Sequence, residues 1–202
     1  MKNQTQIITI QKIWRGCNTR KNLMKIKDSM NITNLKRCID IYINTINIET
    51  IINQDLNKKK IRYSNFPSHI SENIVKFAIA KKYKIMPNWD THKGDLVLNN
   101  LRIEVKGSIN LYNGPPTFGP TEYWDRIYFV DGIDFKLNKY DIYEIKLSSS
   151  SEKWKNLKVN KTETFFDQCL QKRRPRLTFY EIKKQLNDDC KLFFSGHISE
   201  LY

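Results

Sequence analysis

The sequence predicts a mixed α/β (α+β) protein, in which helices flank a central mixed sheet of about five strands and a helical extension precedes them. Two observations lead to this prediction. In the first part of the chain, apolar residues recur at the three- and four-residue intervals of amphipathic helices. Beyond residue 85, short apolar runs alternate with turn-forming residues, which is the pattern of strands and hairpins. We therefore expect helices and a sheet to share one core.

The N-terminal part is predicted to be helical. Residues 1–27 form a basic amphipathic stretch, and residues 29–52 place apolar side chains at helical intervals. The lysine run that follows indicates a solvated linker. We therefore expect a basic helical N-terminal extension over residues 1–60 and the main domain over residues 61–202.

The main domain should begin with a helix from Ser68, which can act as its N-cap, to about Tyr83. Glu72 is expected in the first turn of this helix, away from the apolar stripe. It is either a favourable charge at the helix N-terminus or, if the helix packs beside the sheet, a further carboxylate of a site there. The predicted strands are residues 85–89, 96–98, 101–105, 124–130, 140–147 and 192–194, and residues 178–186 form a closing helix.

Composition limits the function. Lys and Arg outnumber Asp and Glu by 35 to 21, which gives a net charge of +14. Such an excess favours a polyanionic partner, nucleic acid first and an anionic membrane second. A codon bias toward Lys, Asn and Ile is the alternative explanation of part of the excess. It does not explain the arginine-rich run near residue 174.

Cysteine usage and hydropathy suggest where the protein works. The four cysteines form no CxxC pair and no finger-like spacing with histidine, so reduced thiols are expected. No apolar run approaches the ~18 residues of a membrane helix, and the N-terminus is too polar for a secretory signal. We expect an intracellular protein, in the cytoplasm or nucleus of a host, that is neither secreted nor membrane-bound.

The stretch GDLVLNNLRIEVKG, residues 94–107, carries the main chemical prediction. Asn99 and Asn100 tolerate positive φ, so the apolar runs on either side predict a tight β-hairpin. Glu104 and Lys106 then project from one face of the second strand. Pairing across the hairpin can bring Asp95 beside that face, which predicts a divalent-metal site with a lysine next to it.

A second E-x-K pair, Glu144 and Lys146, shows that the spacing alone is not specific. We prefer Glu104 and Lys106 because only that pair has an aspartate on the paired strand.

At this hairpin the chain resembles the PD-(D/E)XK nuclease superfamily, whose signature is an acidic residue on one strand and D/E-x-K on the next. Asp95 and Glu104-Val105-Lys106 match it, although Gly94 replaces the leading proline. The order of elements over residues 66–147 is similar to the α-β-β-β-α-β core of that superfamily. The runs EVKGS, FGPTEYWDRIYFVDG and KRRPRLTF look like those of small type II restriction endonucleases.

The resemblance implies roles for the matching residues. Asp95, Glu104 and the backbone carbonyl of Val105 would hold Mg²⁺, and Lys106 would orient or activate the attacking water. Glu72 would be the helix acid that some members use. Ser108 and the loop after it lie where members often contact DNA.

Several residues are predicted to contact DNA. Lys93 lies just before the hairpin, and Asn110 and Tyr112 lie in the turn-rich loop after Ser108. The segment Lys172-Arg173-Arg174-Pro175-Arg176 is a strong candidate for phosphate contact. Its alternative interpretation is a solvated run of charge.

Residues 10–20 match the spacing IQxxxRGxxxR and resemble an IQ motif. That resemblance implies a calmodulin-like partner at residues 7–21, with apolar anchors in a groove and arginines at an acidic rim. The alternative is a basic arm that docks on its own domain or on DNA. An IQ-like arm on a restriction-type core, in a chain rich in Asn, Ile and Lys, would suit a viral protein of a large DNA virus.

The sequence thus predicts an Mg²⁺-dependent type II restriction-type endonuclease, a hydrolase that cuts double-stranded DNA at a short specific site, working as a homodimer. One alternative is a repair nuclease or Holliday-junction resolvase with the same core. The other is a non-enzymatic, basic DNA-binding or calmodulin-binding adaptor.

Overall fold

The computed structural model describes residues 31–55, 61–90, 94–109 and 115–201. The predicted basic helix with its IQ-like motif lies outside these residues, as do Lys93, Asn110 and Tyr112. Within the described part of the chain, no helix is both long enough and apolar enough to cross a membrane.

A six-stranded mixed sheet forms the centre of the fold, with the strands side by side in chain order. The third and fourth strands are parallel, and every other neighbouring pair is antiparallel. The strands are β1 (Asn88–Trp89), β2 (Leu96–Leu98), β3 (Leu101–Ser108), β4 (Arg126–Asp131), β5 (Lys139–Ile145) and β6 (Cys190–His197). The predicted fold class is confirmed, and the six strands overlap the six segments predicted for a sheet of about five strands.

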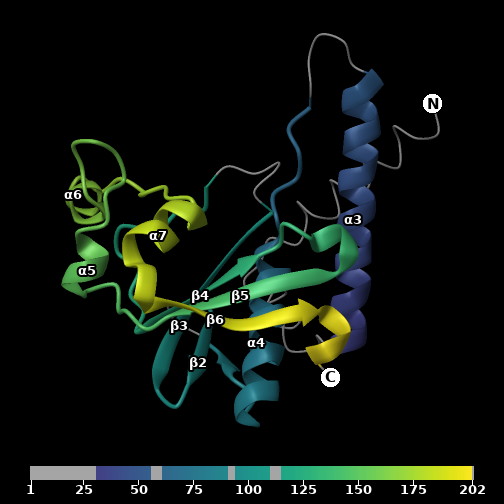
Figure 1. The fold of residues 1–202 in the computed structure, drawn as a ribbon, viewed down its shortest axis with the longest axis horizontal. Coiled ribbons are helices and arrows are strands. Elements are labelled where there is room, and N and C mark those ends of the chain that lie inside the picture. The colour runs from purple at the N-terminus through teal and green to yellow at the C-terminus, as the bar shows by residue number, and fades with distance from the viewer. Residues whose placement is uncertain (1–30, 56–60, 91–93, 110–114, 202) are drawn as a thin grey trace.

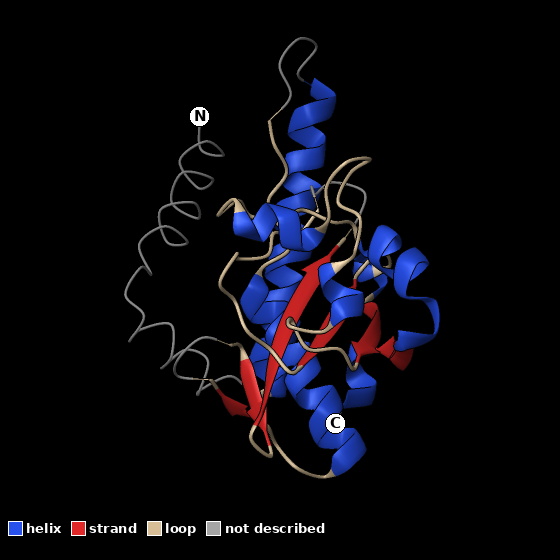
Figure 2. Ribbon diagram, turned by 90° about the vertical axis from the view of Figure 1, so that its left-hand side faces the viewer, coloured by secondary structure: helices blue, strands red, loops and turns tan. Residues whose placement is uncertain are grey.

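Helices lie on both sides of this sheet, as Figure 2 shows. In Figure 1 the helices α5, α6 and α7 gather together, away from the long helix α3. The α-helices are α3 (Ile32–Asp55), α4 (Ser68–Tyr83), α5 (Glu152–Lys155), α6 (Phe165–Leu170) and α7 (Phe179–Leu186). The short 3-10 helices are η1 (Phe135–Leu137), η2 (Asn187–Asp189) and η3 (Ile198–Leu201).

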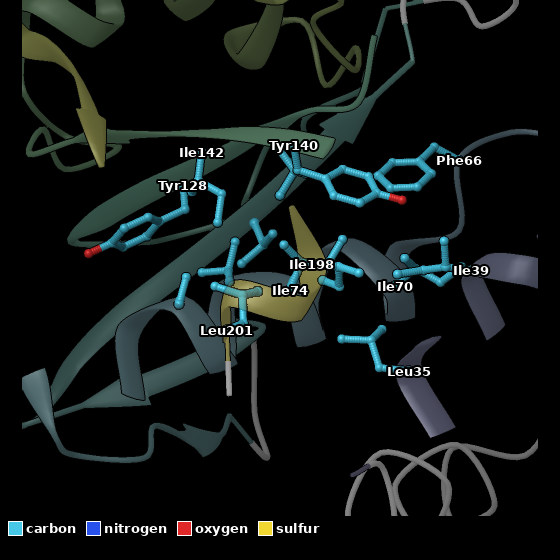
Figure 3. Packing of buried hydrophobic residues seen from close by; sticks show 14 of the residues in the cluster. Leu35, Ile39, Phe66, Ile70, Ile74, Tyr128, Tyr140, Ile142, Ile198 and Leu201 are labelled. Carbon is cyan, nitrogen blue, oxygen red and sulfur yellow. The ribbon is translucent and has the colours of Figure 1, made fainter. Parts of the chain in front are cut away.

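One face of the sheet packs against α3 and α4. Leu35 and Ile39 of α3 are buried with Ile70 and Ile74 of α4 and with Tyr128 of β4 (Figure 3). The sequence placed a domain boundary near residue 60, yet α3, on its N-terminal side, shares this core with α4 and the sheet. Burial of these apolar side chains therefore ties α3 to the sheet that carries the hairpin.

The opposite face has an aromatic core. Phe118, Trp124 and Trp154 are fully buried and meet at centroid distances of 5.4–5.9 Å. On β4, Phe129 stacks on Phe179 of α7 at 4.1 Å. Because β4 is apolar on both faces, it is buried on both, as its nearly continuous apolar run predicts.

Local signals explain most element ends. Asn99 and Asn100 have φ of 50° and 65°, as expected for the predicted tight turn between β2 and β3. Thr178 caps α7 in a reciprocal capping box with Glu181. The start of α4 differs from the prediction, because Pro67 is the N-cap residue and Ser68 is already helical. Proline is favoured near helix starts, where its missing N–H costs nothing.

Candidate active site

The β2–β3 hairpin brings Asp95 beside the middle of β3. The Asp95 backbone N–H donates to the Ile103 carbonyl at 3.2 Å, and its carboxylate Oδ2 accepts from the Val105 N–H at 2.8 Å. Glu104 and Lys106 lie on β3 on either side of Val105. The predicted convergence of an aspartate, a glutamate and a lysine is therefore present.

Lys106 is paired with two acids, one on β3 and one in the loop before β4. Its Nζ donates to Glu104 Oε1 at 2.5 Å and lies 3.8 Å from Oε2 of Glu122. The ammonium also lies 5.3 Å from the centre of the Phe118 ring. The lysine is thus held within the site by charge and by an aromatic face.

Glu72 reaches the site from α4. It lies beyond the first turn of the helix and is buried, whereas the sequence placed it in the first turn and off the apolar stripe. The close approach of α4 depends on Gly107, because a Cβ there would lie 2.8 Å from atoms of Phe66 and Ser71. Because α4 packs against β3, Glu72 points into the pocket. The periodicity of the sequence does not predict this packing.

Burial and like charge shape the electrostatics of the site. Desolvation, reinforced by Glu104 and Glu72, raises the pKa of Asp95 well above its ordinary value. Burial likewise raises the pKa of Glu104, although Lys106 opposes the shift. For Lys106, burial favours the neutral form, but Glu104 and Glu122 outweigh it and raise the pKa. Close, buried carboxylates of this kind are typical of sites that bind cations.

We expect Asp95→Asn to stabilise the metal-free protein at neutral pH. Because the folded-state pKa of Asp95 is raised, its carboxylate costs stability once pH rises from the ordinary value of 3.8 through the folded value. Asparagine avoids this cost and keeps an oxygen for the Val105 N–H. Each 1 kcal/mol gained would raise Tm by about 2–4 °C.

Thermal melts at several pH values, with exposed Asp188→Asn as the control, measure this effect. The gain should shrink at acid pH, where Asp95 is protonated in both states. A variant that melts below the wild type at neutral pH would contradict the prediction.

The carboxylates open into a pocket of about 580 Å³. Glu72, Asp95, Glu104, Lys106 and Glu122 all line it. The remaining lining residues are Arg62, Asn65, Phe66, Ser68, Ser71, Val105, Gly107, Pro115, Pro116, Thr117 and Arg176. The pocket therefore combines buried acids with cations at its rim.

The basic segment near residue 174 reaches this pocket in part. Pro175 accepts a backbone hydrogen bond from Phe118 at 3.0 Å, which brings Arg176 to the pocket wall. Arg174 lies 3.8 Å from Glu122, and Arg173 is bound to Glu163 at 2.6 Å. Lys172 is exposed and begins this segment with a φ of 57°.

Ser108 does not line the pocket. It is buried at the end of β3, although the sequence placed it among the DNA-contacting residues.

The second E-x-K pair has a different role. Glu144 on β5 is buried and accepts hydrogen bonds from Arg126 at 2.7 Å and from the Tyr128 hydroxyl at 2.8 Å. Lys146 lies 3.7 Å from Glu144, with its side chain 62% exposed. This pair belongs to a network on β4 and β5 and does not line the pocket, and the preference for Glu104 and Lys106 as the site pair stays a prediction.

Glu122 is a residue of the site that sequence reasoning missed. Its backbone N–H donates to Gly119 at 3.3 Å, and a Cβ at residue 119 would meet its carboxylate at 2.5 Å. The turn over Gly119 therefore lets the side chain fold toward Lys106. The glycine-proline pair ahead of Glu122 was the available signal, but it does not reveal which way the turn points.

The donor set fits a hard divalent cation in part. Asp95, Glu104 and the Val105 carbonyl supply oxygen ligands, and Mg²⁺ needs only one or two carboxylates because it keeps several waters. Among the described residues, no three His, Cys, Asp or Glu side chains lie close enough to form a metal centre by themselves. Metal binding here would use both carboxylates together with backbone and water oxygens.

Comparison with known proteins places the chain in a family. The sequence profile of the Bsp6I restriction endonuclease family matches residues 29–186. The chain belongs to this restriction endonuclease family. It is also 30% identical to the type II restriction enzyme Bsp6I of Bacillus sp. (strain RFL6) over 126 residues, which is 61% of this chain and 68% of that enzyme. No solved structure matches it significantly.

The family match spans α3, the hairpin and the basic segment. The N-terminal stretch with the IQ-like motif precedes the matched residues.

Proposed function

We propose that this chain is an Mg²⁺-dependent type II endonuclease that hydrolyses phosphodiester bonds of double-stranded DNA at a short specific site. The observation that carries the proposal is the pairing of Asp95 with the Glu104–Lys106 segment of β3 in a pocket rimmed by arginine. Membership of the restriction endonuclease family supports it. The net charge of +14 suits a polyanionic substrate.

Asp95, Glu104 and the Val105 carbonyl would hold Mg²⁺, and the bound ion would supply polarisation of the scissile phosphate and a lowered pKa of a coordinated water. Lys106 supplies a fixed positive charge where negative charge develops at phosphorus. Glu72 lines the same pocket as these carboxylates. A further acid there would favour the binding of a cation. Arg176 lies where it can contact the DNA backbone beside the reacting phosphate.

Glu122 gives Lys106 a second partner. If Glu104 held a cation, its 2.5 Å hydrogen bond to the Lys106 ammonium would weaken, and Glu122, at 3.8 Å, would keep the ammonium in the site. We therefore assign Glu122 the role of a positioning residue for Lys106.

We expect Glu122→Gln to lower the cleavage rate on the order of tenfold. The alkaline limb of the pH–rate profile should also move to lower pH, because Glu122 is one of the groups that raise the pKa of Lys106. Glu152→Gln, on the exposed surface of α5, is the matched control. An unchanged alkaline limb in Glu122→Gln would refute the assignment.

A plasmid assay tests the overall function. Purified protein should convert supercoiled plasmid to discrete fragments with Mg²⁺, and EDTA should abolish the products. A smear, or cleavage confined to branched DNA, would support a repair nuclease or a resolvase instead. DNA binding without any cleavage would support the non-enzymatic adaptor.

The other sequence predictions belong to this proposal. A homodimer would match a two-fold symmetric site, and the protein would act inside a cell. The calmodulin-like partner at residues 7–21 and the viral origin stay predictions.

A further inference from the structure

A strip of chain between α3 and α4, residues 61–65, forms part of the wall of the pocket together with Phe66, which follows it. Arg62, Asn65 and Phe66 line the pocket together with the carboxylates of the site. Arg62 and Asn65 are exposed, whereas Phe66 is buried in the core between the sheet and the helices. The strip therefore presents polar side chains from a backbone that is anchored at one end.

Two buried polar side chains of α3 hold the other part of this strip. Asn53 donates from Nδ2 to the Ile61 carbonyl at 3.1 Å and accepts from the Ile61 N–H at 2.7 Å. Glu49 accepts from the Ser64 N–H at 2.8 Å and from the Ser64 hydroxyl at 2.6 Å. We refer to these four residues as the polar latch.

The polar latch supplies hydrogen-bond partners to the buried side chains of Glu49 and Asn53. Glu49 and Asn53 are only 8% and 6% exposed, and burying such groups without hydrogen-bond partners is unfavourable. Tyr42 adds a hydrogen bond from its hydroxyl to the Ser64 carbonyl at 3.2 Å and packs its ring 5.6 Å from that of Phe66. The side chains of α3 thus determine where residues 61–65 lie relative to the pocket.

We propose that residues 61–65 are a DNA-contacting strip, in which Arg62 binds a backbone phosphate, and that Glu49 and Asn53 are positioning residues for it. The proposal rests on the proposed function, because it takes DNA as the ligand of the pocket. Arginine suits this role, since its planar guanidinium makes paired hydrogen bonds to phosphate oxygens. Asn65 can add a neutral hydrogen bond to the same backbone.

The direct test is DNA binding by Arg62→Ala. A fluorescein-labelled linear duplex of mixed sequence is titrated with protein in Ca²⁺, at several salt concentrations, and anisotropy is recorded. We expect affinity to fall on the order of tenfold and the slope of log K against log salt to shrink by about 0.9, as for one lost phosphate contact. Arg37→Ala, an exposed arginine on α3 that does not line the pocket, should match the wild type.

The latch is tested by Asn53→Ala, since Asn53 itself does not line the pocket. We expect weaker DNA binding and a raised KM with kcat nearly unchanged, because the strip is displaced while the carboxylates stay in place. Thr50→Ala is the control, since that hydroxyl donates within α3, to the Ile46 carbonyl at 2.7 Å, and not to the strip. Circular dichroism establishes that each variant is folded.

The outcomes separate the two proposals. If Arg62→Ala keeps the affinity and salt slope of Arg37→Ala, the DNA-contacting strip is refuted, whatever the cleavage assay shows. If Asn53→Ala lowers only Tm and binds DNA like Thr50→Ala, the positioning role is refuted. A wild-type protein that binds DNA through Arg62 but never cleaves it would overturn the proposed function and leave the strip standing.

Discussion

Lys106→Ala should cleave plasmid DNA about a hundred- to a thousandfold more slowly than the wild type, while Lys146→Ala should cleave normally. Both lysines end an E-x-K segment: Lys106 lies on β3, and Lys146 directly follows β5 of the same sheet. Only Lys106 lines the pocket and bonds to Glu104, whereas the side chain of Lys146 is 62% exposed beside a structural glutamate. Lys146→Ala is therefore a matched control for Lys106→Ala within the same chain.

Single-turnover cleavage of plasmid at saturating protein measures the chemical step. DNA affinity in Ca²⁺ should stay within a few-fold of the wild type, since the loss concerns the transition state. Lys106→Arg keeps the positive charge but replaces the compact ammonium with a planar guanidinium. Its cleavage rate should lie between those of Lys106→Ala and the wild type. Equal rates for Lys106→Ala and the wild type would remove the lysine from the mechanism and the site assignment with it.

The largest loss of stability is expected for Arg126→Met. Arg126 on β4 donates to the buried Glu144 carboxylate at 2.7 Å, and the Tyr128 hydroxyl donates to the same oxygen at 2.8 Å. Removing the arginine leaves a buried carboxylate without its main counter-charge, which costs about 3–5 kcal/mol in such sites. Because the Arg126 side chain is 22% exposed, we expect the lower end of that range.

Urea denaturation measures the free energy of unfolding. The double variant Arg126→Met with Glu144→Gln should regain part of the lost free energy of unfolding, because no unpaired carboxylate is left buried at residue 144. Lys146→Ala should change stability by no more than about 0.5 kcal/mol, as for an exposed pair. A loss below about 1 kcal/mol in Arg126→Met would show that water screens Glu144 despite its burial.

Much of the local structure could be predicted from the residues. Asn99-Asn100 predicted the hairpin because both residues tolerate positive φ, and its register placed Asp95 opposite β3. Alternation along β3 predicted that Glu104 and Lys106 share a face, since side chains of a strand alternate by rule. These features depend only on near neighbours in the chain.

Other features depend on packing between distant segments. Gly107 lets α4 approach β3, which turns Glu72 into the pocket, and nothing within α4 itself reports that approach. Glu122 faces Lys106 only because the turn over Gly119 folds back.

The sequence by itself predicted the fold class, the hairpin and the meeting of Asp95, Glu104 and Lys106, whose catalytic role stays a prediction. The tertiary structure decided which acids lie beside them, that Glu144 pairs with Arg126 and Tyr128, and that α3 holds residues 61–64 by hydrogen bonds. Glu49 and Asn53 show the reason: they look like ordinary polar residues of a helix until the strip at residues 61–65 folds against them. Such contacts join segments whose meeting depends on the whole core, and no local pattern encodes them.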